Sequence, residues 1–342
     1  MPLLSVIIPA YNASSTIRLC LESVFSLPLT ESEREVIVVD DCSTDDTLSV
    51  LSQYKSVVVV RQEYNQRQGA ARNKGIDICS GEYVMFVDAD DIISSDGILQ
   101  ALEAVRKSGS DICYFGFEFQ TKDGAWCKVE VPEAIRNSIV DSKTYLEKYY
   151  TTDFNGPWRS LYRTSFLKGT GIRFVEGARW EDCDWSVKVL SRAKTIQFVD
   201  GVGYRYCFNG NSTIRQRNAG TMANRVYAGR RLMEFGEEVQ EILPSLSEKV
   251  TAEGRNQYVL DELRLRNLTK YPIGVVQELY QLMGQEGRNA LLAYEWPVWV
   301  RFFLRHKVGS LAFLHLACPC ARLGRSVMHR IRKTGQGARF RR

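Results

Sequence analysis

Three carboxylates follow one short apolar run in the first part of the chain. The stretch YVMFVDADDIIS, residues 83–94, begins with apolar residues that predict a buried strand, and Asp88, Asp90 and Asp91 follow that strand. Carboxylates crowded at a buried edge repel one another, which raises their pKa unless a cation neutralises them. Mg²⁺ or Mn²⁺ does so with one or two protein carboxylates plus substrate phosphates. The stretch therefore predicts a metal and diphosphate site, although a solvated loop with helix-capping aspartates would share this pattern.

The positions of the histidines limit which residues can act as a general base or metal ligand near this acidic cluster. All three, His306, His315 and His329, lie near the carboxyl end of the chain, and the acidic part before them has none. Any general base or metal ligand in that part is therefore expected to be a carboxylate.

Four apolar runs, each followed by a polar loop, organise the first 94 residues. SVIIPAYN predicts a strand ending at Pro9, after which Ser14 or Ser15 can cap a helix whose apolar residues recur with the helical period. EVIVVDDCSTDDT predicts a strand over 35–39, a polar loop and a second helix. A third run, 57–60, leads through RQEYNQRQGAARNKG into a helix around 70–78, and 83–87 is the fourth run.

Continuous apolar strands that alternate with helices indicate a parallel sheet covered on both faces. Such sheets bind ligands beyond the carboxyl ends of their strands. Three polar segments, 9–12, 40–46 and 88–91, are expected to converge on that edge. A nicotinamide dehydrogenase is disfavoured, because PAYNASS lacks the glycines that its first strand-to-helix turn needs to approach pyrophosphate.

Beyond residue 94 the pattern is mixed. DICYFGFEFQ, TIQFVD and GYRYCF predict strands, 143–150 predicts a helix, and helical periodicity dominates from about residue 216. These patterns predict a catalytic domain over 1–215, made of a nucleotide-binding half, 1–94, and an acceptor half, 95–215. A mainly helical C-terminal region follows over 216–342.

Charge and cysteine usage indicate a cytoplasmic protein with a basic tail. Residues 296–342 contain eleven lysines and arginines and no acidic residue, whereas the whole chain has a net charge of +5. The nine cysteines are scattered as reduced thiols would be, and neither a leader nor a spanning segment is expected. Interspersed aromatic residues in the tail favour peripheral contact with the anionic inner face of the cell membrane. Packing of these aromatics on protein is the alternative, and no nucleic-acid partner is expected.

The motifs SVIIPAYN, VIVVDDCSTDDT, NQRQGAARNKG and YVMFVDADD, in this order, resemble those of glycosyltransferase family 2. The resemblance implies a GT-A fold, which is an α/β, Rossmann-like fold with a mostly parallel central sheet and flanking helices. It also implies a nucleotide-sugar donor, usually a UDP-sugar, and inversion at the anomeric carbon. Donor-binding positions carried over from the motifs are Pro9, Ala10, Tyr11, Asn12, Asp40, Asp41, Arg72, Asn73, Asp88, Ala89 and Trp158.

Within that resemblance, Asp41 and Asp40 read uracil or ribose, and Arg72 faces the uracil or phosphates. Asp88 and Asp90 form the D-x-D, with Asp90 as the more direct ligand of Mg²⁺ or Mn²⁺. Trp158 offers a stacking surface for a sugar, and core packing is its alternative.

Two later motifs complete the resemblance. RWEDCDW resembles the family's E-D motif, which makes Asp182 the catalytic base, unless Glu181 and Asp182 only favour a helix N-terminus. Asp184 is expected to point elsewhere. YRYCFNGNSTIRQ implies phosphate contacts from Ser212, Thr213 and Arg215, and a third metal ligand is left unassigned.

The sequence thus predicts a metal-dependent inverting glycosyltransferase of surface polysaccharide or glycolipid synthesis, whose partners are a nucleotide sugar and a saccharide or lipid-linked acceptor. A sugar nucleotidyltransferase is one alternative, although PAYNASS lacks the glycine-rich basic loop that such an enzyme needs. A nonenzymatic sugar-nucleotide-binding protein is the other. The sequence names neither the sugar nor the linkage.

Overall fold

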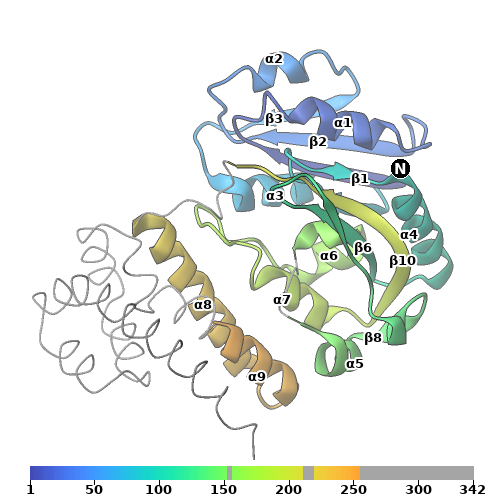
Figure 1. Cartoon of the computed structure of the whole chain (residues 1–342), viewed down its shortest axis with the longest axis vertical. Coiled ribbons are helices and arrows are strands. Elements are labelled where there is room, and N and C mark those ends of the chain that lie inside the picture. The colour runs from blue at the N-terminus through green and yellow to red at the C-terminus, as the bar shows by residue number, and fades with distance from the viewer. Residues whose placement is uncertain (152–155, 211–218, 255–342) are drawn as a thin grey trace, which may run out of the picture. The chain divides into compact units, whose positions relative to one another are not determined.

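The computed structural model describes residues 1–151, 156–210 and 219–254 (Figure 1). By its internal contacts the chain divides into two units, one made of Met1–Arg215 with Arg231–Ala252 and the other of the remaining residues. Residues 231–252 thus belong with the catalytic part, although their sequence pattern groups them with the C-terminal region. Ser212, Thr213, Arg215 and the tail 296–342 lie outside the described residues. None of the helices in the described parts is long and apolar enough to cross a bilayer.

The first four strands are parallel and occur in the sheet order β3-β2-β1-β4. They are β1 (Leu4–Ala10), β2 (Arg34–Asp40), β3 (Val57–Arg61) and β4 (Tyr83–Phe86), joined through α1 (Ile17–Phe25), α2 (Thr47–Leu51) and α3 (Arg67–Ile78). All four predicted strands are confirmed. Their carboxyl ends lie at one edge of the sheet, as the continuous apolar runs require.

The second half of the domain extends the same sheet. Its strands are β5 (Ile92–Ile93), β6 (Ile112–Gln120), β7 (Trp126–Val129), β8 (Ile139–Asp141), β9 (Ser160–Arg163) and β10 (Thr195–Tyr206). The main path continues β4-β9-β6-β10-β5, in which β9 and β5 run opposite to the other strands. The predicted α/β class with a mostly parallel central sheet is therefore confirmed.

Several helices connect or follow these strands. They are α4 (Ser95–Ser108), α5 (Ser142–Thr144), α6 (Thr164–Thr170), α7 (Trp185–Arg192), α8 (Ala219–Val239) and α9 (Pro244–Glu253), with 3-10 turns at Glu133–Ile135 and Pro157–Arg159. The helix predicted over 143–150 is α5 followed by a π-helical turn, Tyr145–Tyr149.

Two local predictions are corrected by the structure. Helix α1 has Thr16 at its N-cap rather than Ser14 or Ser15, and no side chain caps it, because the backbone N–H groups of Thr16 and Ile17 already donate to the Ala13 carbonyl oxygen in a turn before the helix. TIQFVD and GYRYCF form one continuous strand, β10, whose register shifts near Val202 absorb the interruption.

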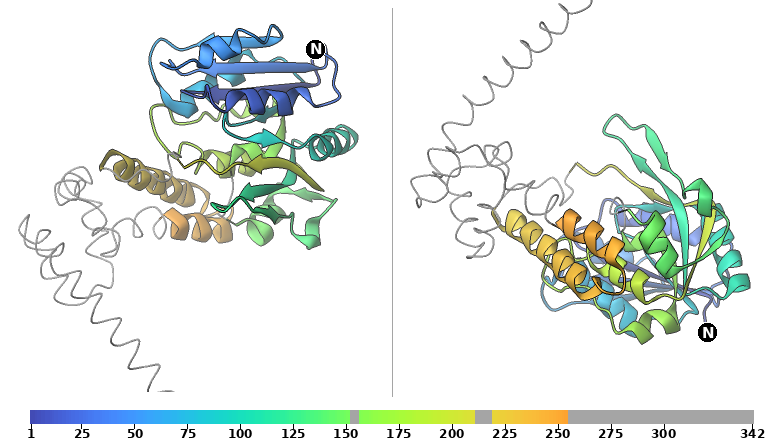
Figure 2. Two further views of the ribbon diagram at one scale, coloured as in Figure 1. Left: turned by 45° about the horizontal axis from the view of Figure 1, so that its top comes forward. Right: turned by 90° about the horizontal axis from the view of Figure 1, so that it is seen from below.

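Helices cover both faces of the sheet (Figures 1 and 2). Helices α1 and α4 pack on one face, in a core that includes Val6, Ile8 and Met85. The alternate residues of the same strands face α3 and α7: Phe86 contacts Trp185 edge to face, with ring centroids 5.6 Å apart. Strand alternation therefore directs the even-numbered positions of β4, and Asp88 after them, toward the α3 face.

Two glycines allow α3 to approach its neighbours closely. A Cβ at Gly75 would lie 2.3 Å from Ile7 Cγ2 on β1, and a Cβ at Gly69 would lie 2.3 Å from the carbonyl oxygen of Val175. Side chains at these positions would push the helix away from the sheet and from the loop before α7. Because both positions are glycine, the residues between them on α3, including Arg72, lie against the acidic edge.

Candidate functional site

The loop after β1 is held by the loop after β2. Asn12 adopts a left-handed backbone conformation, with φ of 49°, which asparagine tolerates better than most residues. Its backbone N–H donates to Ser43 Oγ at 2.9 Å. Pro9 and Ala10 end β1 and are buried, whereas the Tyr11 side chain is exposed. Tyr11 and Asn12 are thus the exposed residues of this segment, and Asn12 Oδ1 already accepts from the backbone N–H of Thr44 at 2.8 Å.

The two aspartates after β2 shape the turn that leads into α3. Asp41 Oδ1 accepts from Gln62 Nε2 at 2.7 Å and from the backbone N–H of Gln66 at 2.6 Å, and Oδ2 accepts from the N–H of Arg67 at 2.7 Å. Burial raises the pKa of Asp41, although these hydrogen bonds oppose the shift. Asp40 is fully buried. Recognition of uracil or ribose by this pair stays a prediction.

Arg72 joins the D-x-D loop to the loop that carries the E-D motif. Its side chain is buried; Nη2 donates to Asp88 Oδ1 at 2.6 Å, and Nη1 donates to Glu181 Oε1. The guanidinium also lies over the Phe174 ring, 5.3 Å from its centroid. Burial lowers the pKa of Arg72, but the two carboxylates outweigh burial and hold it above its usual range. The guanidinium is therefore a fixed positive charge between two loops.

Asn73, the neighbour of Arg72, contacts the loop before α7. Its Nδ2 donates to the Phe174 carbonyl oxygen and to Glu176 Oε1, each at 2.9 Å, and its Oδ1 accepts from the Phe174 N–H at 2.9 Å. The side chain is buried. Arg72 and Asn73, which the motif predicts to bind the donor together, thus have different contacts. Arg72 faces the carboxylates, whereas the amide of Asn73 holds the loop before α7.

Asp91, the third aspartate of DADD, anchors β10 to the acidic loop. Its carboxylate accepts from Tyr204 Oη and from the backbone N–H of Cys207, both at 2.7 Å. Tyr204 Oη also accepts from the backbone N–H of Asp88 at 3.2 Å. Sequence reasoning did not single out Tyr204, whose only signal was its position in a strand-like stretch. Burial and the charges of Asp88 and Asp90 raise the pKa of Asp91 well above its ordinary value.

Asp88 and Asp90 are the residues that could hold a metal ion. Asp90 Oδ2 accepts from Asn209 Nδ2 at 2.8 Å, while Ala89 between the two aspartates is buried. Burial, and then the charge of Asp88, raises the pKa of Asp90. This excess of negative charge fits a divalent cation that takes two protein carboxylates and completes its shell with phosphates and water. No cluster of three or more His, Cys, Asp or Glu ligands occurs within residues 1–151, 156–210 and 219–254.

Asp182 lies in the turn before α7, next to the Arg72 network. It is half-buried, and burial followed by the charge of Glu181 raises its pKa to about 7. The helix itself begins at Trp185, with Asp184 as its N-cap. Glu181 pairs with Arg72 of α3, a contact that the alternative of a favourable helix N-terminus does not include. Asp184 points elsewhere, as expected, to Lys188 and Arg231.

Trp158 packs in the core of the domain. One face of its indole stacks on Tyr204, with centroids 4.6 Å apart and planes 22° apart, and Phe117 contacts it edge to face. Only 7% of the residue is exposed. The packing alternative for Trp158 is therefore the one that the structure supports.

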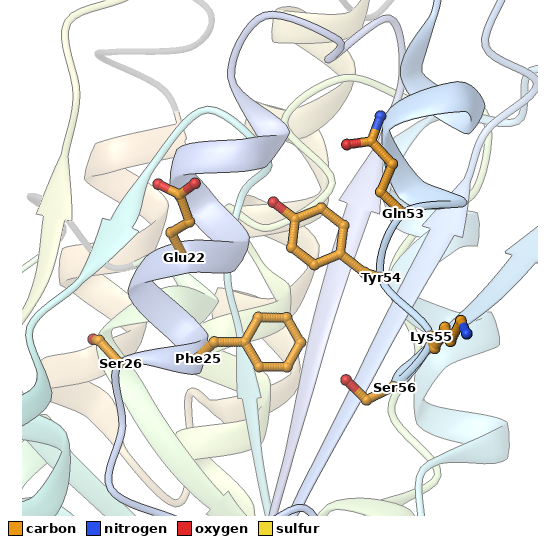
Figure 3. Close-up of a pocket in the computed structure, with 7 residues that line it drawn as sticks. All are labelled: Glu22, Phe25, Ser26, Gln53, Tyr54, Lys55 and Ser56. Carbon is orange, nitrogen blue, oxygen red and sulfur yellow. The ribbon is translucent and has the colours of Figure 1, made fainter.

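A shallow surface hollow of about 590 Å³ lies between α1 and the segment after α2 (Figure 3). Phe25 and Tyr54 stack there, with ring centroids 5.9 Å apart. Tyr54 precedes β3, so this hollow lies toward the amino ends of the parallel strands, away from the carboxylates. The candidate site is therefore located by its crowded charge rather than by this hollow.

The fold and the acidic edge define a GT-A domain. Residues 5–171, slightly less than half of the chain, match the model of the family described as Glycosyl transferase family 2. The family resemblance in the sequence is thus confirmed.

Curated relatives and a solved structure agree with this assignment. A poly(ribitol-phosphate) beta-glucosyltransferase of Bacillus spizizenii is 32% identical over 59% of this chain and 32% of its own length. The uncharacterized glycosyltransferase YibD of Escherichia coli is 26% identical over 64% of each chain. The matches thus span less than two thirds of either relative. S. aureus TarS in complex with UDP-GlcNAc shares the fold, with a TM-score of 0.63 and 21% identity over 94% of this chain and 92% of that chain.

The Arg72 network predicts a large effect on stability. Replacing Arg72 by Met leaves Asp88 and Glu181 without their shared counter-charge, so we expect the free energy of unfolding to fall by about 3–5 kcal/mol. Urea denaturation of the full chain would measure this change. Lys107→Met is the matched control, because its pair with Glu103 is exposed on α4 and screened by water, so its loss should change the free energy of unfolding little. Equal losses for the two variants would contradict the role of Arg72.

Proposed function

We propose that this protein transfers a sugar from a nucleotide-sugar donor, a UDP-sugar, to an acceptor hydroxyl with inversion at the anomeric carbon. The observation that carries the proposal is the linkage of Asp88 through Arg72 to the Glu181–Asp182 turn, with a half-buried carboxyl group in that turn whose pKa is about 7. The family match supports the donor class but ends before this turn, so the base assignment depends on geometry.

The acceptor class follows from the relatives. Their printed names include a poly(ribitol-phosphate) glucosyltransferase, and the structural neighbour binds UDP-GlcNAc. These names support a role in assembling a cell-surface polysaccharide or glycolipid, with a saccharide or lipid-linked saccharide as the acceptor. The acceptor half of the domain would select it.

In the proposed reaction Asp182 is the general base. The acceptor oxygen forms a bond to the anomeric carbon as its proton passes to the Asp182 carboxylate. The bond between that carbon and the diphosphate oxygen breaks on the opposite face, and the nucleoside diphosphate leaves with the electron pair. A base whose pKa lies near neutrality combines a useful ionised fraction with adequate basicity. Glu181, held by Arg72, fixes the turn in which this base lies.

Asp90 and Asp88 would hold Mg²⁺ or Mn²⁺. When bound, such an ion offsets the negative charge that develops on the departing diphosphate. We propose that Tyr11 and Asn12, exposed on the adjoining loop, contact the nucleoside. Arg72 already donates hydrogen bonds to two carboxylates. We therefore propose that it fixes the positions of the loops around the site rather than contacting phosphate directly.

Two other functions are less well supported. A sugar nucleotidyltransferase would need a glycine-rich, phosphate-binding loop after the first strand, but β1 ends in the buried pair Pro9 and Ala10, and the loop that begins at Tyr11 has no glycine over 11–15. A nonenzymatic binding protein has no use for a carboxyl group poised near pH 7. Measured turnover of a nucleotide sugar distinguishes an enzyme from such a binding protein.

A nucleotide-sugar screen tests the donor and the metal together. We expect the full chain to hydrolyse a UDP-sugar when Mg²⁺ or Mn²⁺ is present, and Asp90→Ala to lose this activity while keeping the thermal transition of the wild type. Turnover at the normal rate in EDTA would exclude the proposed metal role. Turnover of none of the nucleotide sugars would instead favour the binding protein.

The raised pKa of Asp182 predicts the pH dependence. Only the ionised carboxylate can accept a proton, so kcat/KM for donor hydrolysis should fall as pH drops through about 7, rather than near the ordinary aspartate pKa of about 4. Asp182→Asn should lower kcat by roughly 10²-fold or more and abolish this limb of the profile. Asp77→Asn, an exposed carboxylate on α3, is the control. An unchanged acid limb in Asp182→Asn would show that another group titrates.

Peripheral membrane contact through residues 296–342 is proposed on their composition alone. Eleven basic residues and no acidic ones favour an anionic surface. We expect the full chain, and not a chain ending before Trp296, to sediment with anionic liposomes at low salt. Equal sedimentation of both would contradict the proposal.

A further inference from the structure

The turn that carries Glu181 and Asp182 is also held by an arginine that the proposed reaction does not use. Arg231 lies on α8, in the part of that helix that belongs with the catalytic unit, and it is 5% exposed. Its Nε donates to Asp184 Oδ1 at 2.9 Å, and its Nη2 donates to the Trp180 carbonyl oxygen at 2.7 Å. Trp180 and Asp184 flank the acidic pair, so one guanidinium holds both ends of the turn.

The backbone of this turn requires such support. Trp180 has φ of 54°, a left-handed conformation that is strained for a bulky residue and persists only where its surroundings impose it. The hydrogen bond from Arg231 acts directly on the carbonyl group of this strained residue. A planar guanidinium suits the task, because it donates in two fixed directions at once.

The two arginines hold the turn from different elements. Arg72, on α3, binds Glu181 inside the turn, and Arg231, on α8, binds the residues on either side. We propose that Arg231 is a positioning residue for the base, which keeps the Asp182 carboxyl group directed at the reacting edge. This inference rests on the proposed function, and it makes a helix beyond the family match part of the catalytic apparatus.

A purely structural ion pair is the competing explanation. Asp184 also pairs with Lys188, whose Nζ lies 2.9 Å from Oδ2. Lys188 is four residues along the same helix, so its ion pair with Asp184 is local to α7. Its ammonium also lies 5.9 Å from the centroid of the Phe235 ring on α8, and a methionine side chain can keep an apolar contact with that ring. Lys188→Met therefore removes a charge partner of the same carboxylate without releasing the turn from α8, and it serves as the matched control.

The test separates catalysis from binding in the full chain. For Arg231→Met we expect kcat for hydrolysis of UDP-GlcNAc with Mn²⁺ to fall by about 10- to 100-fold, since a displacement of about 1 Å can cost this much. The Kd for UDP should change by no more than about twofold. Arg231→Lys should recover part of kcat, and Lys188→Met should retain it. A thermal transition close to the wild-type value would show that each variant is folded.

Parallel measurement of Asp182→Asn keeps the two proposals separate. If Asp182→Asn is inactive but Arg231→Met has wild-type kcat, the positioning role is refuted and the base stands. If Asp182→Asn is fully active, the proposed base is wrong and the positioning role falls with it. Equal losses of kcat and UDP affinity in Arg231→Met would mean general damage and would also refute the inference. If Arg231→Met does not fold, the double variant Arg231→Met with Asp184→Asn is measured instead, because it removes the aspartate charge that would otherwise be left without Arg231. The same outcomes then apply to the double variant.

Discussion

The ion pairs of Arg72 with Asp88 and Glu181 are the interactions on which the site depends. A buried guanidinium is stable only where carboxylates compensate for its lost hydration, and each carboxylate is in turn costly without it. The partners lie 16 and 109 residues away in sequence, so the pairs fix two distant loops against one helix. Lysine could not take this place with the same geometry, because Arg72 donates to its two partners from separate nitrogens of one rigid plane.

Around this charge, each aspartate takes a role from its surroundings. Asp91 is enclosed by Tyr204 and the backbone of Cys207, which makes it an anchor for β10. Asp88 is paired with Arg72, while Asp90 retains the excess negative charge that suits a cation. Asp182, half-buried beside Glu181, has the raised pKa of a base. These similar carboxyl groups thus differ in burial and in neighbouring charge, and these differences support the structural, metal-binding and basic roles that we propose for them.

The C-terminal part of the chain contributes to this arrangement. Residues 231–252 pack with the catalytic unit, and Arg231 among them reaches the turn before α7. The match to the family model ends at residue 171, so the acidic loop after β4 lies within it, whereas the Glu181–Asp182 turn and Arg231 lie after it.

Local pattern in the sequence determined the strands and the edge at which they meet. Apolar runs that end in polar loops specify parallel strands and predicted Asp88 and Asp90 as site residues, whereas Arg72 and Asp182 were predicted from the resemblance to the family's motifs. Pattern could not decide what each side chain contacts, because contacts join residues about a hundred positions apart. Only the tertiary structure directed Asn73 to Phe174, stacked Trp158 on Tyr204, and brought Arg231 to the turn. The reason is physical: periodicity reports which face of an element is buried, whereas the partner on that face is chosen by the packing of the whole domain.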